Sequence, residues 1–129
     1  MRTLLILGSF YGLSGIILGA FGAHALKARI DPSQLLSYET GVRYQLIHAV
    51  LILVLALWSR QYPAPLLQAA GYVMAGGVAL FSFSIYLLAT RTLTGLTGWA
   101  WLGPVTPIGG GLMIIGWSLI LVWAIQQKT

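Results

Sequence analysis

The stretch that decides how this chain folds is SYETGVRYQLIH, residues 37–48, which leads directly into the apolar run from Ala49 to Trp58. It contains the only glutamate, Glu39, together with Arg43 and one of the two histidines, His48. The apolar run alone is too short to cross a bilayer, because a crossing takes roughly 20 residues. The helix must therefore extend back through the polar stretch. Ionisable groups at membrane depth usually face a bundle interior, a partner or a wet cavity.

The composition of the whole chain is that of an integral membrane protein. Of its 129 residues, 58% are hydrophobic and 7% are charged, whereas about a quarter of a soluble domain is charged. Mean hydropathy is +0.88. Charged residues are separated by long uncharged runs at 3–26, 45–59, 61–90 and 92–127. There is room for four spans in a single domain.

Charge and residue inventory exclude several functional classes. The net charge of +5 suits short loops near anionic headgroups, and the basic residues form no stripe for nucleic acid. The chain has no cysteine, which rules out disulfides, thiol nucleophiles and cysteine metal sites. No metal-ligand spacing or nucleophile elbow occurs. We therefore predict no catalytic, cofactor-binding or metal-binding residues, and no enzymatic activity.

We predict an all-α, integral membrane four-helix bundle with antiparallel up-down connectivity and both termini on the same face. The helices are expected at about 3–25, 32–58, 64–90 and 106–125. Asp31 and Gln34 around Pro32 form a capping box that begins the second helix. Thr106 and the proline after it predict an N-cap for the fourth. Trp99 and Trp101, in the loop before it, are expected to be interfacial anchors.

Small residues predict close helix packing in lipid. The glycines of the first helix recur at spacings of three and four, which keeps them on one stripe. A second stripe lies on the third helix. The predicted packing residues are Gly8, Gly12, Gly15, Gly19 and Gly22, with Gly71, Ala75 and Ser82.

The first apolar segment has a competing interpretation as a signal peptide. Arg2 precedes an apolar run that ends in Ala23-His24-Ala25, an A-x-A cleavage pattern. Cleavage would leave three spans and remove the glycine stripe. Sequencing the N-terminus of the purified protein distinguishes the two interpretations.

A polar cluster is predicted at the end of the bundle where the second and fourth helices begin. Its candidate ligand-binding residues are His24, Glu39, Arg43, Tyr44, Gln45, His48, Thr106, Gly109 and Gly110. Glu39 and Arg43 share a helix face and either form a structural ion pair or, through Arg43 and the open glycine backbone of the fourth helix, create an anion pocket. Gln45 and His48, on the other side of the second helix, are expected to bond other helices.

The two histidines also raise the question of haem, since helix bundles place iron between facing histidines. The depths argue against it: His24 is near the end of the first helix, whereas His48 lies well inside the second. A colourless protein would exclude bis-histidine haem.

Three segments together resemble a known family: residues 19–26 (GAFGAHAL), residues 39–45 (ETGVRYQ) with His48, and residues 106–110 (TPIGG). They resemble the domain-of-unknown-function 423 family, small bacterial inner-membrane proteins similar to the mitochondrial transmembrane protein 256. The likeness covers nearly the whole chain in order and spacing. It implies a four-helix, multi-pass protein of the bacterial inner membrane, and it implies no activity.

The function we expect is that of an accessory or structural membrane protein that binds membrane lipid, a partner membrane protein or a second copy of itself. An oligomeric small-solute or proton transporter is the alternative, with His48, Gln45 and Glu39 as the proton path. A haem or quinone protein is a third interpretation, which rests on the histidines alone.

Overall fold

The computed structural model describes residues 1–95, 98 and 100–128, and these are predominantly helical. The elements in order are α1 (Arg2–Phe21), η1 (Gly22–Leu26), α2 (Pro32–Gln61), α3 (Pro65–Val78), η2 (Ala79–Phe83), α4 (Ser84–Ala89), α5 (Arg91–Thr94), η3 (Ala100–Leu102) and α6 (Val105–Gln126). Four continuous helical stretches are long and apolar enough to cross a membrane: Arg2–Leu26, Pro32–Gln61, Pro65–Ala89 and Val105–Gln126. The helical class is therefore confirmed, and so are four helices of sufficient length and apolarity to cross a membrane. The first and third segments each contain a π-helical turn, η1 and η2.

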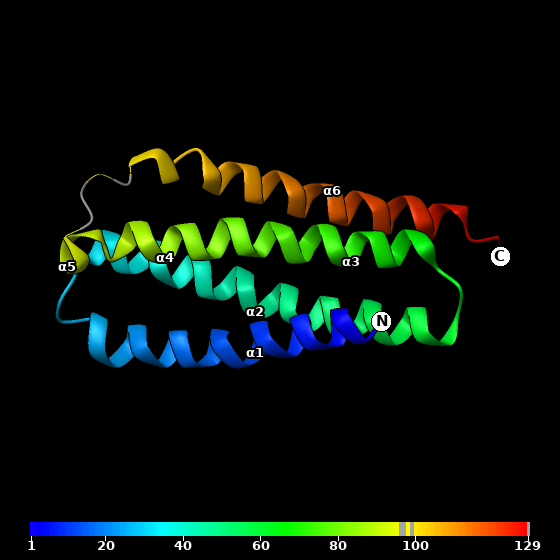
Figure 1. The fold of residues 1–129 in the computed structure, drawn as a ribbon, viewed down its shortest axis with the longest axis horizontal. Helices are drawn as coiled ribbons and strands as arrows, with labels where there is room; N and C mark the ends of the chain where they lie inside the picture. The colour runs from blue at the N-terminus through cyan, green and yellow to red at the C-terminus, as the bar shows by residue number, and fades with distance from the viewer. Residues whose placement is uncertain (96–97, 99, 129) are drawn as a thin grey trace.

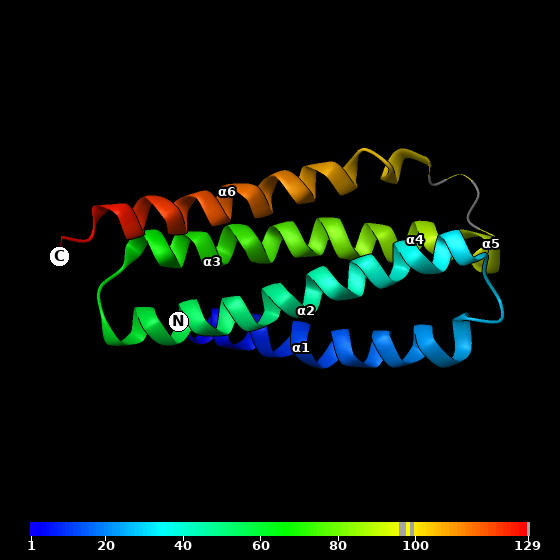
Figure 2. The same cartoon turned by 180° about the vertical axis from the view of Figure 1, so that it is seen from behind.

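The second and third spanning segments form the centre of the bundle. In Figures 1 and 2 the four segments lie lengthwise, with α1 and α6 on opposite sides of the pair made by α2 and α3. α1 packs mainly on α2, and α6 packs mainly on α3. The most apolar windows of the two central segments are 39% and 44% buried, against 22% and 17% for the outer two. Polar side chains on α2, η2 and α4 can therefore be shielded from lipid.

The glycines of α1 form the contact with α2. A Cβ added at Gly15 would lie 2.7 Å from Cδ2 of Leu46, so a larger residue there would require the Leu46 side chain to move. Gly12 differs: a Cβ there would meet no described atom within 4 Å. The part of the predicted stripe that contacts α2 is Gly8, Gly15, Gly19 and Gly22, and including Gly12 was wrong. Gly12 lies at the edge of the stripe, on a part of the helix surface that does not face α2.

The predicted stripe of the third segment faces the first two. A Cβ at Gly71 would lie 3.0 Å from Leu4 of α1. The carbonyl of Ala75 accepts a hydrogen bond of 2.7 Å from the Tyr11 hydroxyl. Ser82, in η2, donates to the carbonyl of Gly41 on α2 at 2.8 Å. Small residues bring the helices close, and hydroxyls then bond backbone carbonyls across the contact.

α6 approaches α3 through glycines that were predicted to have another role. Gly109 was expected to leave an open backbone for an anion. Instead, a Cβ on Gly109 would lie 2.7 Å from the carbonyl oxygen of Gly77 and would overlap the backbone of Phe81. Gly116, two turns further along α6, lies against Met74 in the same way. The anion pocket predicted at Gly109 is therefore occupied by α3 and η2.

The two predicted helix starts have different outcomes. α2 begins at Pro32, and the Asp31 backbone N–H donates to Oε1 of Gln34 at 3.4 Å, which confirms the capping box. α6 begins at Val105, so Thr106 is inside the first turn and is not the N-cap. Its hydroxyl lies 2.6 Å from Oγ of Ser84, and this contact with α4 replaces capping of its own helix.

Aromatic side chains gather at the end of the bundle where α2 and α6 end. The Trp58 ring lies 5.8 Å from that of Tyr62 and 5.8 Å from that of Trp123. Such a group is typical of a membrane–water interface. Of the two predicted anchors at the other end, Trp101 is 63% exposed, and Trp99 lies outside the described residues.

We expect Gly109→Ala to destabilise the protein by about 1–3 kcal/mol, the usual cost of overpacking, because the new methyl would meet backbone atoms that cannot move aside. Gly111→Ala is the matched control, since a Cβ there would meet no described atom within 4 Å. Thermal unfolding in detergent measures both. Equal stability of the two variants would contradict the Gly77–Gly109 contact.

Candidate functional site

Gln45 is the centre of a hydrogen-bond network in the interior. Its side chain is fully buried. Its Nε2 donates to the carbonyl of Tyr11 at 2.9 Å and to Oγ of Ser14 at 2.8 Å, both on α1. Its Oε1 accepts from the Tyr86 hydroxyl of α4 at 2.6 Å. One amide therefore connects α2 to two other helices, as the sequence led us to expect, and all of its hydrogen-bonding atoms are engaged.

The same network continues toward the end of the bundle. The Tyr86 ring lies 5.0 Å from the ring of Tyr38. The Tyr38 hydroxyl donates to the carbonyl of Leu18 on α1 at 2.6 Å. Every hydroxyl in this interior group is directed at a protein acceptor, which is what burial in an apolar environment requires. The network explains how the helices are held together.

The predicted polar cluster is divided among several places. His24, Glu39 and Arg43 are exposed. Among the described residues, Glu39 and Arg43 form no ion pair with each other. They lie on the side of α2 opposite Gly41 and Gln45 because four residues advance a helix by little more than one turn. The predicted pairing is therefore absent, and Arg43 does not face the start of α6.

The two histidines are also apart. Gly22, close to His24, packs on Tyr38. His48 is ten residues beyond Tyr38, or about 15 Å along the helix. The two side chains are too distant to ligate one iron. His48 is instead buried and bonded within its own helix and to Trp117 of α6.

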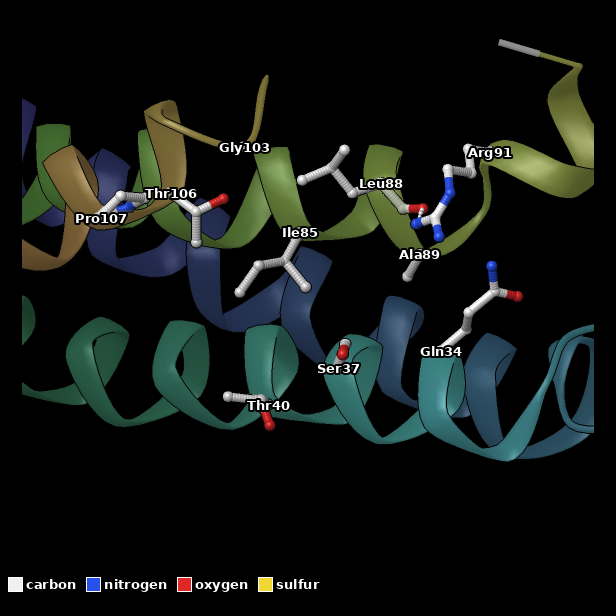
Figure 3. A pocket seen from close by; sticks show the side chains of 10 residues that line it. All are labelled: Gln34, Ser37, Thr40, Ile85, Leu88, Ala89, Arg91, Gly103, Thr106 and Pro107. Carbon is white, nitrogen blue, oxygen red and sulfur yellow. Dashed lines mark hydrogen bonds between the residues drawn. The ribbon is translucent and has the colours of Figure 1, made fainter. Parts of the chain in front are cut away.

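An open cavity of about 510 Å³ lies between the start of α2, the end of α4 and the start of α6. Figure 3 shows Arg91 and Gln34 at one end of it, Thr106 and Pro107 at the other, and Ile85 between them. The lining residues are Gln34, Ser37, Thr40, Ile85, Leu88, Ala89, Arg91, Gly103, Thr106 and Pro107. The cavity thus has polar groups from α2 and one cation, Arg91, beside apolar side chains from α4.

The depth of Arg91 follows from the length of the third spanning segment. Pro65–Ala89 has 25 residues, which is about 38 Å of helix. The hydrocarbon core of a bilayer is about 30 Å thick. With Trp58 and Trp123 at one boundary, Arg91 reaches headgroup depth at the other. Thr106, which is level with Ser84, lies about 10 Å deeper.

The hydrogen bonds that the cavity side chains already make determine which of them can donate to a ligand. The hydroxyls of Ser37 and Thr40 donate to carbonyls of their own helix, at 3.2 Å and 2.9 Å. Oε1 of Gln34 accepts the Asp31 N–H, so its amide NH2 remains a donor. Arg91 uses Nη1 on the Leu88 carbonyl at 2.8 Å, and a guanidinium has five N–H groups. The donors are therefore gathered at the headgroup end.

Comparison with known proteins agrees with this architecture. Residues 18–110 match the family described as "Protein of unknown function (DUF423)". The chain belongs to this family. As a DUF423 protein it is similar to the UPF0382 membrane protein YwdK of Bacillus subtilis (strain 168), which is 36% identical over 127 residues, or 98% of each chain. The family resemblance noted from the sequence is confirmed.

Two further relatives bear on the location. The UPF0382 inner membrane protein YgdD of Escherichia coli (strain K12) is 37% identical over 127 residues, which cover 98% of this chain and 92% of the relative. The UPF0382 membrane protein SAB0533 of Staphylococcus aureus is 34% identical over 122 residues, covering 95% and 94%. No solved structure matches the chain. Together with its four spanning helices, these relatives identify a multi-pass protein of the bacterial inner membrane.

Sequence reasoning missed most of the cavity. Of the predicted cluster, only Thr106 lines it. Arg91 directly follows the uncharged run at 61–90, and nothing in its sequence neighbours distinguishes it from a loop charge. The available signal was the spacing of Gln34, Ser37 and Thr40, three residues apart on one helix face, which is the pattern of a polar stripe.

We expect Gln45→Leu to lower the free energy of unfolding by about 1–3 kcal/mol, because the buried Tyr86 hydroxyl loses its acceptor. In a double-mutant cycle with Tyr86→Phe, the coupling should be about 0.6 kcal/mol and at most about 1.7 kcal/mol. Unfolding in mixed micelles measures both quantities. Gln61→Leu, at the exposed end of α2, is the control. Additive effects of the Gln45 and Tyr86 changes would contradict the bond.

Proposed function

We propose that this DUF423 protein is a non-catalytic accessory protein of the inner membrane that binds an anionic phospholipid in the cavity beside Arg91. The proposal includes an up-down antiparallel bundle with both termini on the same membrane face. The observation that supports it most directly is the polarity of the cavity, whose hydrogen-bond donors lie at headgroup depth.

The chemistry of the cavity matches an amphiphile with a negative head. Arg91 and the amide NH2 of Gln34 can donate to phosphate oxygens, and arginine suits phosphate because its donors form a rigid fork. The bond to Leu88 holds the guanidinium at the cavity mouth. In the described part of the chain, no carboxylate lines the cavity, so the charge of the Arg91 guanidinium is not neutralised there.

The apolar lining favours a lipid over a free phosphate. Ile85, Leu88 and Pro107 supply apolar lining to the cavity, and Ile85 lies one helical turn further from Arg91 than Leu88 does. An acyl chain on these residues would continue from a headgroup at Arg91 into the bilayer. Recognition thus belongs to Arg91 and Gln34 in this proposal, in place of the pair Glu39 and Arg43.

We expect native mass spectrometry of the protein from mixed phosphatidylglycerol and phosphatidylethanolamine nanodiscs to show retained phosphatidylglycerol. Arg91→Ala should reduce the retained fraction about tenfold, the effect of losing charge-assisted hydrogen bonds.

Arg43→Ala is the matched control, because Arg43 is an exposed arginine outside the cavity. Equal loss of lipid in both variants would mean general charge attraction and would overturn the proposal. Soluble glycerol phosphate added at the same concentration should not compete. Full competition by it would favour a free phosphate ligand instead.

A further inference from the structure

A second hollow, separate from the cavity beside Arg91, lies on the side of the bundle between α2, η2 and α6. Its volume is about 260 Å³, and its walls include Tyr44, His48, Phe81, Met113 and Trp117. Tyr44 and Trp117 are 41% and 49% exposed, whereas His48 is only 4% exposed. This lateral groove therefore connects a buried imidazole with the lipid-facing surface.

The groove lies near the middle of the membrane. His48 is ten residues from Trp58 on the same helix, which is about 15 Å, or half of a hydrocarbon core of about 30 Å. At this depth there is no water to bond polar groups. Any ligand that bonds here must carry its own polar atoms into the hydrocarbon.

The hydrogen bonds of His48 determine its tautomer. Nδ1 lies 2.7 Å from the carbonyl oxygen of Tyr44, and a carbonyl only accepts, so Nδ1 carries the hydrogen. Nε2 lies 3.2 Å from Nε1 of Trp117, and an indole N–H only donates, so Nε2 is the unprotonated nitrogen and its lone pair accepts the Trp117 N–H. The bond to Trp117 is at the long end of the usual range, and Trp117 is half exposed.

Tyr44 adds a donor. Its ring is nearly parallel to the ring of His48, with an interplanar angle of 10° and a centroid separation of 6.1 Å, and it lies 5.0 Å from the ring of Phe81. Within the described parts of the chain its hydroxyl has no hydrogen-bond partner. An unpaired phenol at mid-membrane is costly.

We propose that the lateral groove binds the head of an isoprenoid quinol, a flat ring with two oxygens on a lipophilic tail. One ring hydroxyl would donate to Nε2 of His48 in place of Trp117, and the Tyr44 hydroxyl would donate to a ring oxygen. The aromatic walls at Tyr44 and Phe81 suit a flat ring. A phospholipid fits poorly, because its oxygens stay at the interface about 15 Å away. Binding alone is proposed, with no electron transfer.

The probe is decylubiquinone, with its reduced quinol as the competitor, in nanodiscs that contain a variant whose only tryptophan is Trp117. The other four, at 58, 99, 101 and 123, are replaced by Phe. Saturable quenching of Trp117 fluorescence by the quinone is expected, and the quinol should displace it under anaerobic conditions. Quenching that rises linearly with probe, as expected for partition into lipid, would overturn the proposal.

Substitutions of the groove residues test where the ring binds. Tyr44→Phe should weaken binding about five- to tenfold, as expected for one lost hydrogen bond. Tyr72→Phe is the matched control, since Tyr72 is 45% exposed on α3 and lies outside the groove. His48→Leu should weaken the quinol and spare the quinone, which cannot donate. Equal affinities for the Tyr44 and Tyr72 variants would overturn the proposal even if the His48 variant does not fold.

Discussion

The rest of this structure depends on the hydrogen bonds that the side-chain amide of Gln45 makes to other helices. In a bilayer, helices gain nothing from hiding apolar surface from one another, so contact depends on close packing and interhelical hydrogen bonds. Gln45 supplies the bonds to α1 and α4, and Gly15 supplies the proximity: a Cβ there would lie 3.4 Å from Nε2 of Gln45. A larger residue at 15 would crowd the side chains of Leu46 and Gln45, and with them the bonds that the amide makes.

The same combination of a small residue and a polar group recurs through the bundle. The carbonyl of Gly41 accepts a hydrogen bond from Ser82, and the absence of a side chain at Gly41 leaves room for the ring of Tyr86. The π-helical turn η2 contains one such contact and directly precedes another: Ser82, within the turn, bonds α2, and Ser84, directly after it, bonds Thr106 of α6. A π-helical turn changes the angular register of a helix. It allows one segment to present hydroxyls to helices on two different sides.

The sequence predicted whatever depends on local chemistry. Composition located the four spans, and Asp31 with Gln34 located the start of α2, because apolar length and capping need no knowledge of neighbours. It did not predict which helix covers which face. Gly109 could be read either as an open backbone or as a packing surface, and only the position of Gly77 on another helix decides. Likewise, only the positions of other helices show that Arg91 lines the cavity and that Arg43 does not.

The positions of α1 and α6 have a consequence for how the protein is made. In the described structure these two helices lie on opposite sides of the central pair and do not pack on each other (Figure 1). α1 and α2 are consecutive in the chain, and their glycines and the Gln45 bonds to Tyr11 and Ser14 need no later segment. They can therefore associate as a hairpin as soon as both have entered the bilayer. α6 finds its surface only after α3 is in place, so the last helix to be synthesised is also the last to acquire neighbours.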